Sequence, residues 1–170
     1  MAKQMMYQEN ARAQLKEGLS RLAAAVKVTM GPTGRNVLLH KSYGSPKITK
    51  DGVSVSKEIE LPEPFQNIGA KMVNQVASKT SDLVGDGTTT AMVLAEAIYA
   101  EGLKYVIAGT NPVSIQRGIN KAAAIAIDYI RSVSKPVKGH EDIAKVAAIS
   151  ANNSPGVGEI LADAMDKVGK

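Results

Sequence analysis

The sequence lacks cysteine and tryptophan, contains one phenylalanine, and draws only 4% of its 170 residues from the aromatic side chains. Without cysteine, disulfide bonds and metal sites built from thiolates are excluded. With so few aromatics, the core must consist of Ala, Val, Ile, Leu and Met side chains, a composition that favours closely packed helices. A chain of this length buries roughly 70% of its unfolded surface as one domain, or holds one domain and part of another.

Long apolar runs are missing as well. No segment approaches the length that spans a membrane, and the N-terminus lacks both the apolar core of a signal peptide and the Arg- and Ser-rich character of a transit sequence. We therefore expect a cytoplasmic protein with no membrane partner. The two histidines, His40 and His140, are far apart and form no H-E-x-x-H pattern, so we expect exposed or hydrogen-bonded side chains there and no metal site.

Positive charge is concentrated in the first third of the chain. Residues 1–57 hold ten Lys and Arg against three acids, whereas residues 58–170 hold eleven against thirteen. A basic segment is compatible with a nucleic-acid binder, which would need its cations on one face and would bind DNA in a salt-dependent way. Because the cations stand singly among apolar positions and not beside aromatics, we expect solvated faces or contacts with an acidic neighbouring subunit, and no nucleic acid.

Apolar residues at helical spacing predict four long helices. The first is expected from an Asn10 cap to about Thr29, the second over Phe65–Leu83, the third after Thr90 to about Ala108, and the fourth from Pro112, capped by Asn111, to Val133. The expected buried faces include Ala11, Leu15, Leu19, Leu22, Val26 and Thr29 in the first helix, Phe65, Ile68, Met72, Val76, Thr80 and Leu83 in the second, Ala91, Leu94, Ala95 and Ile98 in the third, and Ile115, Ile119, Ala122, Ala126, Ile130 and Val133 in the fourth.

Glycine and proline divide the remaining segments. Short strands are predicted over residues 36–40 and 47–49, joined by a turn and closed by a tight turn at Lys50-Asp51-Gly52. Residues 135–139 break the fourth helix, and we place a domain boundary near residue 134, followed by two shorter helices over 141–150 and 157–168. The expected fold is mainly α with a small β hairpin.

The stretch from Val84 to Thr90 has the parts that a phosphate chain carrying magnesium requires. Asp86 lies between two glycines, which let the backbone approach a ligand closely, and offers a hard oxygen ligand to Mg²⁺. Three threonines then open a helix, whose free N–H groups attract anionic oxygens. Alone, the stretch is better explained as an ordinary turn between helices with its N-cap, because such turns are common.

The same stretch matches neither well-known phosphate loop. The chain contains no G-x-x-x-x-G-K-[ST], and Gly85-x-Gly87-x-x-Thr90 follows a predicted helix. A dinucleotide-binding enzyme would need a strand before these glycines and an acidic residue about twenty positions beyond them.

Three glycine-bearing turns together distinguish this chain: Thr29-Met30-Gly31-Pro32, Lys50-Asp51-Gly52 and Asp86-Gly87-Thr88-Thr89-Thr90. In this order they resemble the group I chaperonins, the bacterial Hsp60 family. The resemblance runs along the whole chain, and is carried by residues 23–29, 31–37, 48–53, 85–91, 109–112, 149–152 and 164–169.

The resemblance implies a role for each turn. The first would cradle the nucleotide phosphates through the backbone of Thr29, Met30, Gly31 and Pro32, with Lys50 beside it. The third would hold the phosphates at a helix N-terminus through Gly87, Thr88, Thr89 and Thr90, while Asp86 binds Mg²⁺. Asp51 would be catalytic, placing the attacking water near the γ-phosphate. Met30 departs from the Leu common in the family, which matters little for a backbone contact.

The resemblance also implies a larger protein. Residues 1–133 would be the first segment of an equatorial, ATP-binding and ring-forming domain, and residues 134–170 the beginning of an intermediate hinge domain. The cofactors would be ATP or ADP with Mg²⁺, and K⁺ as a further candidate. Identical subunits would form a double ring that refolds non-native proteins beneath a co-chaperonin lid in the bacterial cytoplasm, an activity of the stress response classed among the isomerases. The apical domain, the returning hinge helix with its catalytic aspartate, and the second equatorial half are absent, so we expect an inactive fragment.

Overall fold

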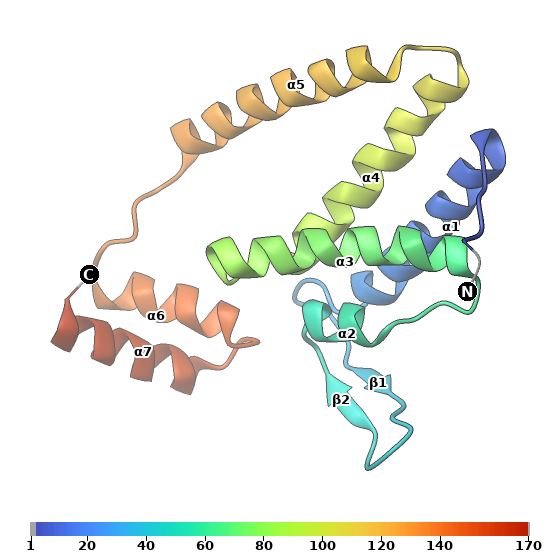
Figure 1. Ribbon diagram of the computed structural model, residues 1–170. Helices are drawn as coiled ribbons and strands as arrows, with labels where there is room; N and C mark the ends of the chain where they lie inside the picture. The colour runs from blue at the N-terminus through green and yellow to red at the C-terminus, as the bar shows by residue number, and fades with distance from the viewer. Residues whose placement is uncertain (1–2, 170) are drawn as a thin grey trace. The chain divides into compact units, whose positions relative to one another are not determined.

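The computed structural model describes residues 3–169, which form seven helices and one two-stranded hairpin (Figure 1). In chain order these are α1 (Gln8–Lys27), β1 (Val37–Leu39), β2 (Lys47–Thr49), α2 (Gly52–Glu58), α3 (Pro64–Val84), α4 (Thr88–Ile107), α5 (Pro112–Val133), α6 (Gly139–Ser150) and α7 (Pro155–Val168). The predicted mainly helical fold with a small hairpin is confirmed. The chain divides into two compact units between Thr110 and Asn111, while the domain boundary near residue 134 stays a prediction.

The first unit is built around α1, which contacts α2, α3 and α4. Its core is aliphatic, as the composition predicts, and consists of Leu19, Leu22, Val26, Val55, Ala70, Val73, Ala77 and Met92. Leu22 and Val26 are fully buried, so the predicted apolar face of the first helix is confirmed in its second half. Val37 and Leu39 of the hairpin pack against the same core.

Two glycines let α1 and α3 approach to backbone contact. A Cβ placed at Gly18 would lie 1.8 Å from the carbonyl oxygen of Gln66, and one at Gly69 would lie 2.2 Å from that of Leu15. No other residue fits at either position without moving the two helices apart. The contact therefore fixes which face of α3 is buried.

That buried face differs from the predicted one. The α3 residues inside the core are Gly69, Ala70, Val73 and Ala77, whereas Ile68, Met72, Val76 and Leu83 are exposed. In α4, Met92 and Leu103 are buried, and the predicted Leu94 and Ile98 are exposed. The prediction for α3 was wrong because it assigned the bulkiest residues to the interior, while close packing against α1 selects small ones. In α4 the interior does take large side chains, but they are Met92 and Leu103 and not the predicted Leu94 and Ile98.

The boundaries of two other elements also differ from the predicted ones. The first helix begins at Gln8, so Asn10 is not its cap, and it ends at Lys27, which leaves Thr29 in the following turn. The tight turn expected to close the hairpin is instead the start of α2, because the Asp51 carboxylate accepts a hydrogen bond of 2.9 Å from the Ser54 N–H. The hairpin itself is confirmed, and Leu38 pairs with Ile48.

The second unit contains α5, α6 and α7. As predicted, Asn111 caps α5, its side-chain oxygen accepting from the Val113 N–H at 2.8 Å, and Pro112 opens the helix. However, α5 buries no residue, so its predicted buried face is wrong for this chain. Helices α6 and α7 lie side by side (Figure 1) over a small core of Ile143, Ala144 and Ala162. No helix within residues 3–169 has the length and apolar character needed to cross a bilayer.

Candidate functional site

The turn after α1 is stabilised by hydrogen bonds within its own backbone. The Arg35 N–H donates to the Val28 carbonyl at 2.7 Å, and the Gly34 N–H donates to the Gly31 carbonyl at 3.0 Å. Thr29 is buried, and its hydroxyl donates to the Val26 carbonyl at 2.8 Å. Gly31 has a φ of 77°, in the left-handed region that favours glycine, and the space where its Cβ would lie is open. The hydrogen bonds therefore fix the shape of the turn, and the space beside Gly31 is open. Met30 and Pro32 are exposed on the turn.

The second predicted turn joins the hairpin to α2. Lys50 is half-buried, Asp51 is exposed, and Gly52 is buried at the first position of the helix. The Asp51 N–H donates to the Thr49 hydroxyl at 3.1 Å, while its carboxylate caps α2. Asp51 is thus held in place by its two neighbours along the chain.

The third turn connects α3 to α4 through two left-handed glycines. Gly85 ends α3 with a φ of 78°, and Gly87 begins α4 with a φ of 77°. Between them, Asp86 is exposed, and its Oδ1 accepts a hydrogen bond of 2.6 Å from the Gly87 N–H. Because α3 precedes the glycines, the strand required for a dinucleotide-binding motif is absent from this part of the described chain.

The start of α4 is suited to an anion. The N-cap residue, Gly87, has no side chain with which to cap the helix, and the first N–H groups of a helix have no partner within it. Thr88 is buried, Thr89 is half-buried and Thr90 is exposed. This arrangement offers backbone N–H groups and hydroxyl donors at the positive end of a helix dipole.

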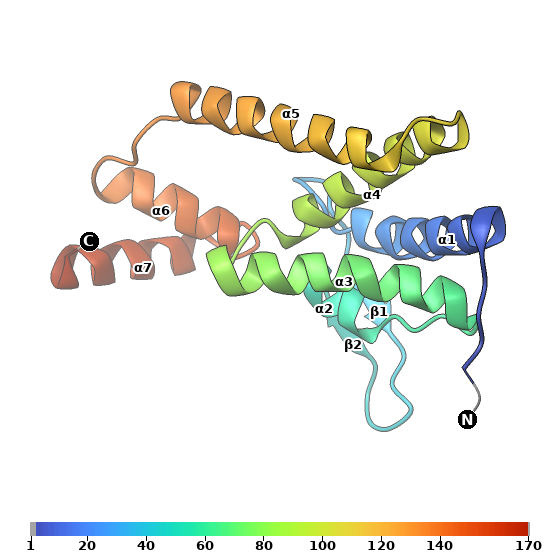
Figure 2. The ribbon, with the colours of Figure 1, turned by 45° about the horizontal axis from the view of Figure 1, so that its top comes forward.

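Parts of the second and third turns meet the end of α1 in space, although they are far apart in sequence. A Cβ placed at Gly52 would lie 2.1 Å from Thr89 Oγ1 and 3.0 Å from Val26 Cγ1. Figure 2 shows the first turn of α4 near the end of α1, and α2 contacts both helices. The structure therefore brings the first residue of α2, Thr89 of α4 and Val26 near the end of α1 into one place.

A metal ion at this place would rely on few protein ligands. Within residues 3–169, no group of three His, Asp or Glu side chains is arranged to hold a metal. Mg²⁺ is commonly bound in proteins by one or two carboxylates, with phosphate oxygens and water completing its shell. The exposed carboxylate of Asp86, on a loop that begins a helix, fits that requirement.

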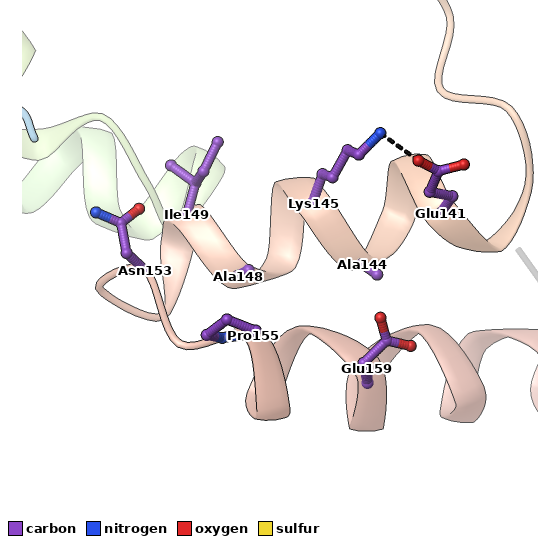
Figure 3. Close-up of a pocket in the computed structure, with 8 residues that line it drawn as sticks. All are labelled: Glu141, Ala144, Lys145, Ala148, Ile149, Asn153, Pro155 and Glu159. Atoms are coloured by element: carbon purple, nitrogen blue, oxygen red, sulfur yellow. Dashed lines mark hydrogen bonds and ion pairs between the residues drawn. The ribbon is translucent and has the colours of Figure 1, made fainter.

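The second unit has two hollows that contain none of the predicted site residues. One is an open groove of about 510 Å³ lined by α6, α7 and their connection, where Glu141 and Lys145 form an ion pair (Figure 3). The other, of about 430 Å³, is lined by Val137, Ile143, Val146, Ala147, Leu161 and Met165. Neither brings together groups that suit phosphate chemistry.

His140 links α6 to α7 by hydrogen bonds. Its Nδ1 lies 2.6 Å from Asp166 Oδ2, and its Nε2 lies 3.0 Å from Glu159 Oε2. The hydrogen bond with Asp166, and then that with Glu159, raise the pKa of His140 above its ordinary value. The prediction that His140 is a hydrogen-bonded histidine is confirmed. Its two partners, Glu159 and Asp166, are seven residues apart in α7 and so lie on one face of that helix.

Comparison with known proteins gives a consistent result. The model of the TCP-1/cpn60 chaperonin family matches residues 22–170. A solved structure of a group III chaperonin in the open state is 29% identical, with a TM-score of 0.76, over 94% of this chain and 32% of that chain. The chaperonin gp146 from the bacteriophage EL 2 (Pseudomonas aeruginosa), solved in the presence of ATP-BeFx, is 26% identical, with a TM-score of 0.76, over 94% of this chain and 28% of that chain. The chain thus spans about a third or less of the length of these relatives.

Proposed function

Because this chain belongs to the TCP-1/cpn60 chaperonin family, we propose that its three glycine turns form part of a Mg-ATP site that powers protein folding. The observation that supports this proposal is the close contact of Gly52 with Thr89 and Val26, which brings the second turn, the third turn and the end of α1 together. A phosphate chain bound there would reach donors from α1, α2 and α4 at once.

Backbone groups, hydroxyl groups and one cation would bind the phosphates. The hydrogen-bonded turn of Thr29, Met30, Gly31 and Pro32 offers backbone groups to the phosphates. The half-buried Lys50 would add a positive charge there. The N–H groups and hydroxyls of Thr88, Thr89 and Thr90, together with the Gly87 backbone, hold further phosphate oxygens.

Two carboxylates are assigned to the metal and to water. Asp86 holds Mg²⁺, which when bound neutralises phosphate charge. Asp51 positions the attacking water, and the hydrogen bonds from Ser54 and to Thr49 keep its side chain and backbone in place for that task. K⁺ is a further candidate cation. Hydrolysis by positioning and charge stabilisation needs no covalent intermediate.

We further propose that the protein is a group I chaperonin subunit of the bacterial cytoplasm. The seven sequence segments that resemble bacterial Hsp60 support this assignment. Residues 1–133 would belong to the ring-forming equatorial domain and residues 134–170 to the hinge. The apolar residues that α5 exposes, among them Ile125, Tyr129 and Ile130, are compatible with burial against further protein surface. The double ring, its lid and its clients are part of the same proposal.

Calorimetric titration with a slowly hydrolysed ATP analogue tests this function. The protein at its natural length should bind the analogue in the presence of Mg²⁺ and much more weakly when EDTA removes the metal. A titration with duplex DNA at low and high salt serves as the comparison for a nucleic-acid binder. Salt-dependent DNA binding without any binding of the analogue would overturn the proposal.

A further inference from the structure

An ion pair connects the end of α1 to α4. Lys27 Nζ lies 2.6 Å from Glu96 Oε2, and the Ser20 hydroxyl donates to the other oxygen, Oε1, at 3.4 Å. Ser20 and Lys27 are seven residues apart in α1, which is two helical turns, so they lie on the same face of the helix. Both oxygens of Glu96 therefore bind to α1.

This pair differs from the other ion pairs described within residues 3–110. The Glu96 side chain is only 19% exposed, whereas Arg21–Glu17 and Lys104–Glu101 are solvent-exposed pairs within one helix. Lys71–Glu60 is also exposed, and its atoms are 3.9 Å apart. The Glu96 carboxylate is partly shielded from water, although the Lys27 side chain is 44% exposed. The pair is therefore less screened than the exposed ones and holds its two helices together more firmly.

The pair lies at the end of α1, directly before the Thr29–Pro32 turn, so a shift of α1 would move that turn. Lys27 is the last residue of α1, and its carbonyl accepts from the Met30 N–H at 3.1 Å. Glu96 is eight residues beyond Thr88, about two turns into the helix that carries the third turn. The pair thus links the backbone of one proposed phosphate-binding turn to the helix that begins at the other.

We infer that Lys27 and Glu96 are positioning residues for the nucleotide site, holding the Thr29–Pro32 turn at a fixed distance from the start of α4. This inference rests on the proposed function. Neither side chain needs to touch the nucleotide, because the pair acts through the backbone of the two turns. Loss of the pair would make the distance between the Thr29–Pro32 turn and the start of α4 less well fixed before ATP binds. It would remove none of the groups that are proposed to contact the nucleotide.

The experiment measures ATP hydrolysis by the protein at its natural length. For Glu96→Gln, which keeps the shape and removes the charge, we expect KM for Mg-ATP to rise about twofold to fivefold, the change expected from an ion pair at the protein surface. We expect kcat to change little, because uniform loosening of binding affects KM. The matched control is Glu101→Gln in the same helix, which removes an exposed pair and should leave KM unchanged.

Charge reversal separates positioning from general stability. Lys27→Glu alone should raise KM, and the double variant Lys27→Glu with Glu96→Lys should restore it, because the pair is re-formed with its charges exchanged. Hydrogen exchange without nucleotide provides an independent measurement: the amides of residues 29–35 should exchange faster in Glu96→Gln than in Glu101→Gln.

Each outcome decides between the two proposals. If the wild-type protein binds Mg-ATP but Glu96→Gln matches Glu101→Gln in KM and exchange, the inference is wrong and the proposed function stands. If KM rises in the single variants and the exchanged pair does not restore it, the ion pair is not what positions the turn. If the wild-type protein binds no Mg-ATP, the proposed function fails and the inference fails with it.

Discussion

The backbone of Gly52 lies directly against the side chain of Thr89, so close that a Cβ at Gly52 would stand 2.1 Å from Thr89 Oγ1. This contact leaves no room for any side chain between α2 and the first turn of α4. It also makes Thr89 sensitive to a change in a residue that carries no functional group itself.

Gly52→Ala should therefore weaken nucleotide binding through Thr89. The new methyl group must displace Thr89 or Val26, and overpacking of this kind costs about 1–3 kcal/mol. We expect a weaker affinity for Mg-ATP and a lower midpoint in urea. Gly118→Ala is the control, because its Cβ would meet nothing within 4 Å and alanine favours the helical conformation. An unchanged affinity in Gly52→Ala would contradict the packing described.

Gly31→Val should impair nucleotide binding more than Met30→Leu. A β-branched residue at a φ of 77° is strained by about 1–3 kcal/mol, and its side chain would enter the open space above the turn. Met30→Leu conserves size and apolar character. Calorimetry on both variants measures the difference, and equal affinities would show that this turn does not face the phosphates.

Gly18→Ala should destabilise the first unit without altering any proposed ligand contact. The added methyl would stand 1.8 Å from the Gln66 carbonyl oxygen, so α1 and α3 must separate at a cost of about 1–3 kcal/mol or more. Thermal unfolding followed by circular dichroism measures the effect. A melting temperature equal to that of wild type would mean that the two helices do not pack at backbone contact.

His140 should make the stability of the α6–α7 pair depend on pH. Hydrogen bonds to Asp166 and Glu159 raise the pKa of His140 in the folded state. The stabilisation is therefore complete below the unfolded pKa of about 6.5 and is lost as pH rises through the higher folded value. Asp163 Oδ1 also lies 3.9 Å from His140 Nε2. Melting curves between mildly acidic and mildly basic pH should lose this component in His140→Gln and keep it in His40→Gln.

The 170 residues expressed alone should self-associate and hydrolyse no significant ATP. Helix α5 buries none of its residues, and Tyr129 is 67% exposed. Each Å² of apolar surface left in water forgoes about 25 cal/mol, and patches of this kind promote association. Size-exclusion chromatography with light scattering and a phosphate-release assay measure both properties. A compact monomer with substantial turnover would contradict this expectation.

Local sequence signals predicted the ends of helices better than their buried faces. Asn111-Pro112 and Gly85 mark helix ends because capping and left-handed backbone depend on adjacent residues. The buried face of α3 depends on Gly18 in another helix, so the periodicity of Ile68 and Met72 within α3 was misleading. Helix α2 was missed because a short Asp-Gly start has the same sequence pattern as a turn.

The candidate site shows the same limit. The chemistry of Asp86 and the threonines was visible in one stretch, since the glycines and the helix start are contiguous. Contact between Gly52 and Thr89 depends on how α1, α2 and α4 pack, and no spacing in the sequence encodes it. The pairing of Lys27 with Glu96, 69 residues apart, has no sequence pattern either.

The most direct test of the proposed ATP site is ATP turnover by Asp86→Ala in the protein at its natural length, with Asp82→Ala as the control on the exposed surface of α3. If Asp86 holds Mg²⁺, turnover should fall severely in Asp86→Ala while the oligomeric state stays that of wild type, and Asp82→Ala should retain its activity. Near-normal turnover by an assembled Asp86→Ala protein would contradict the assignment of the magnesium site.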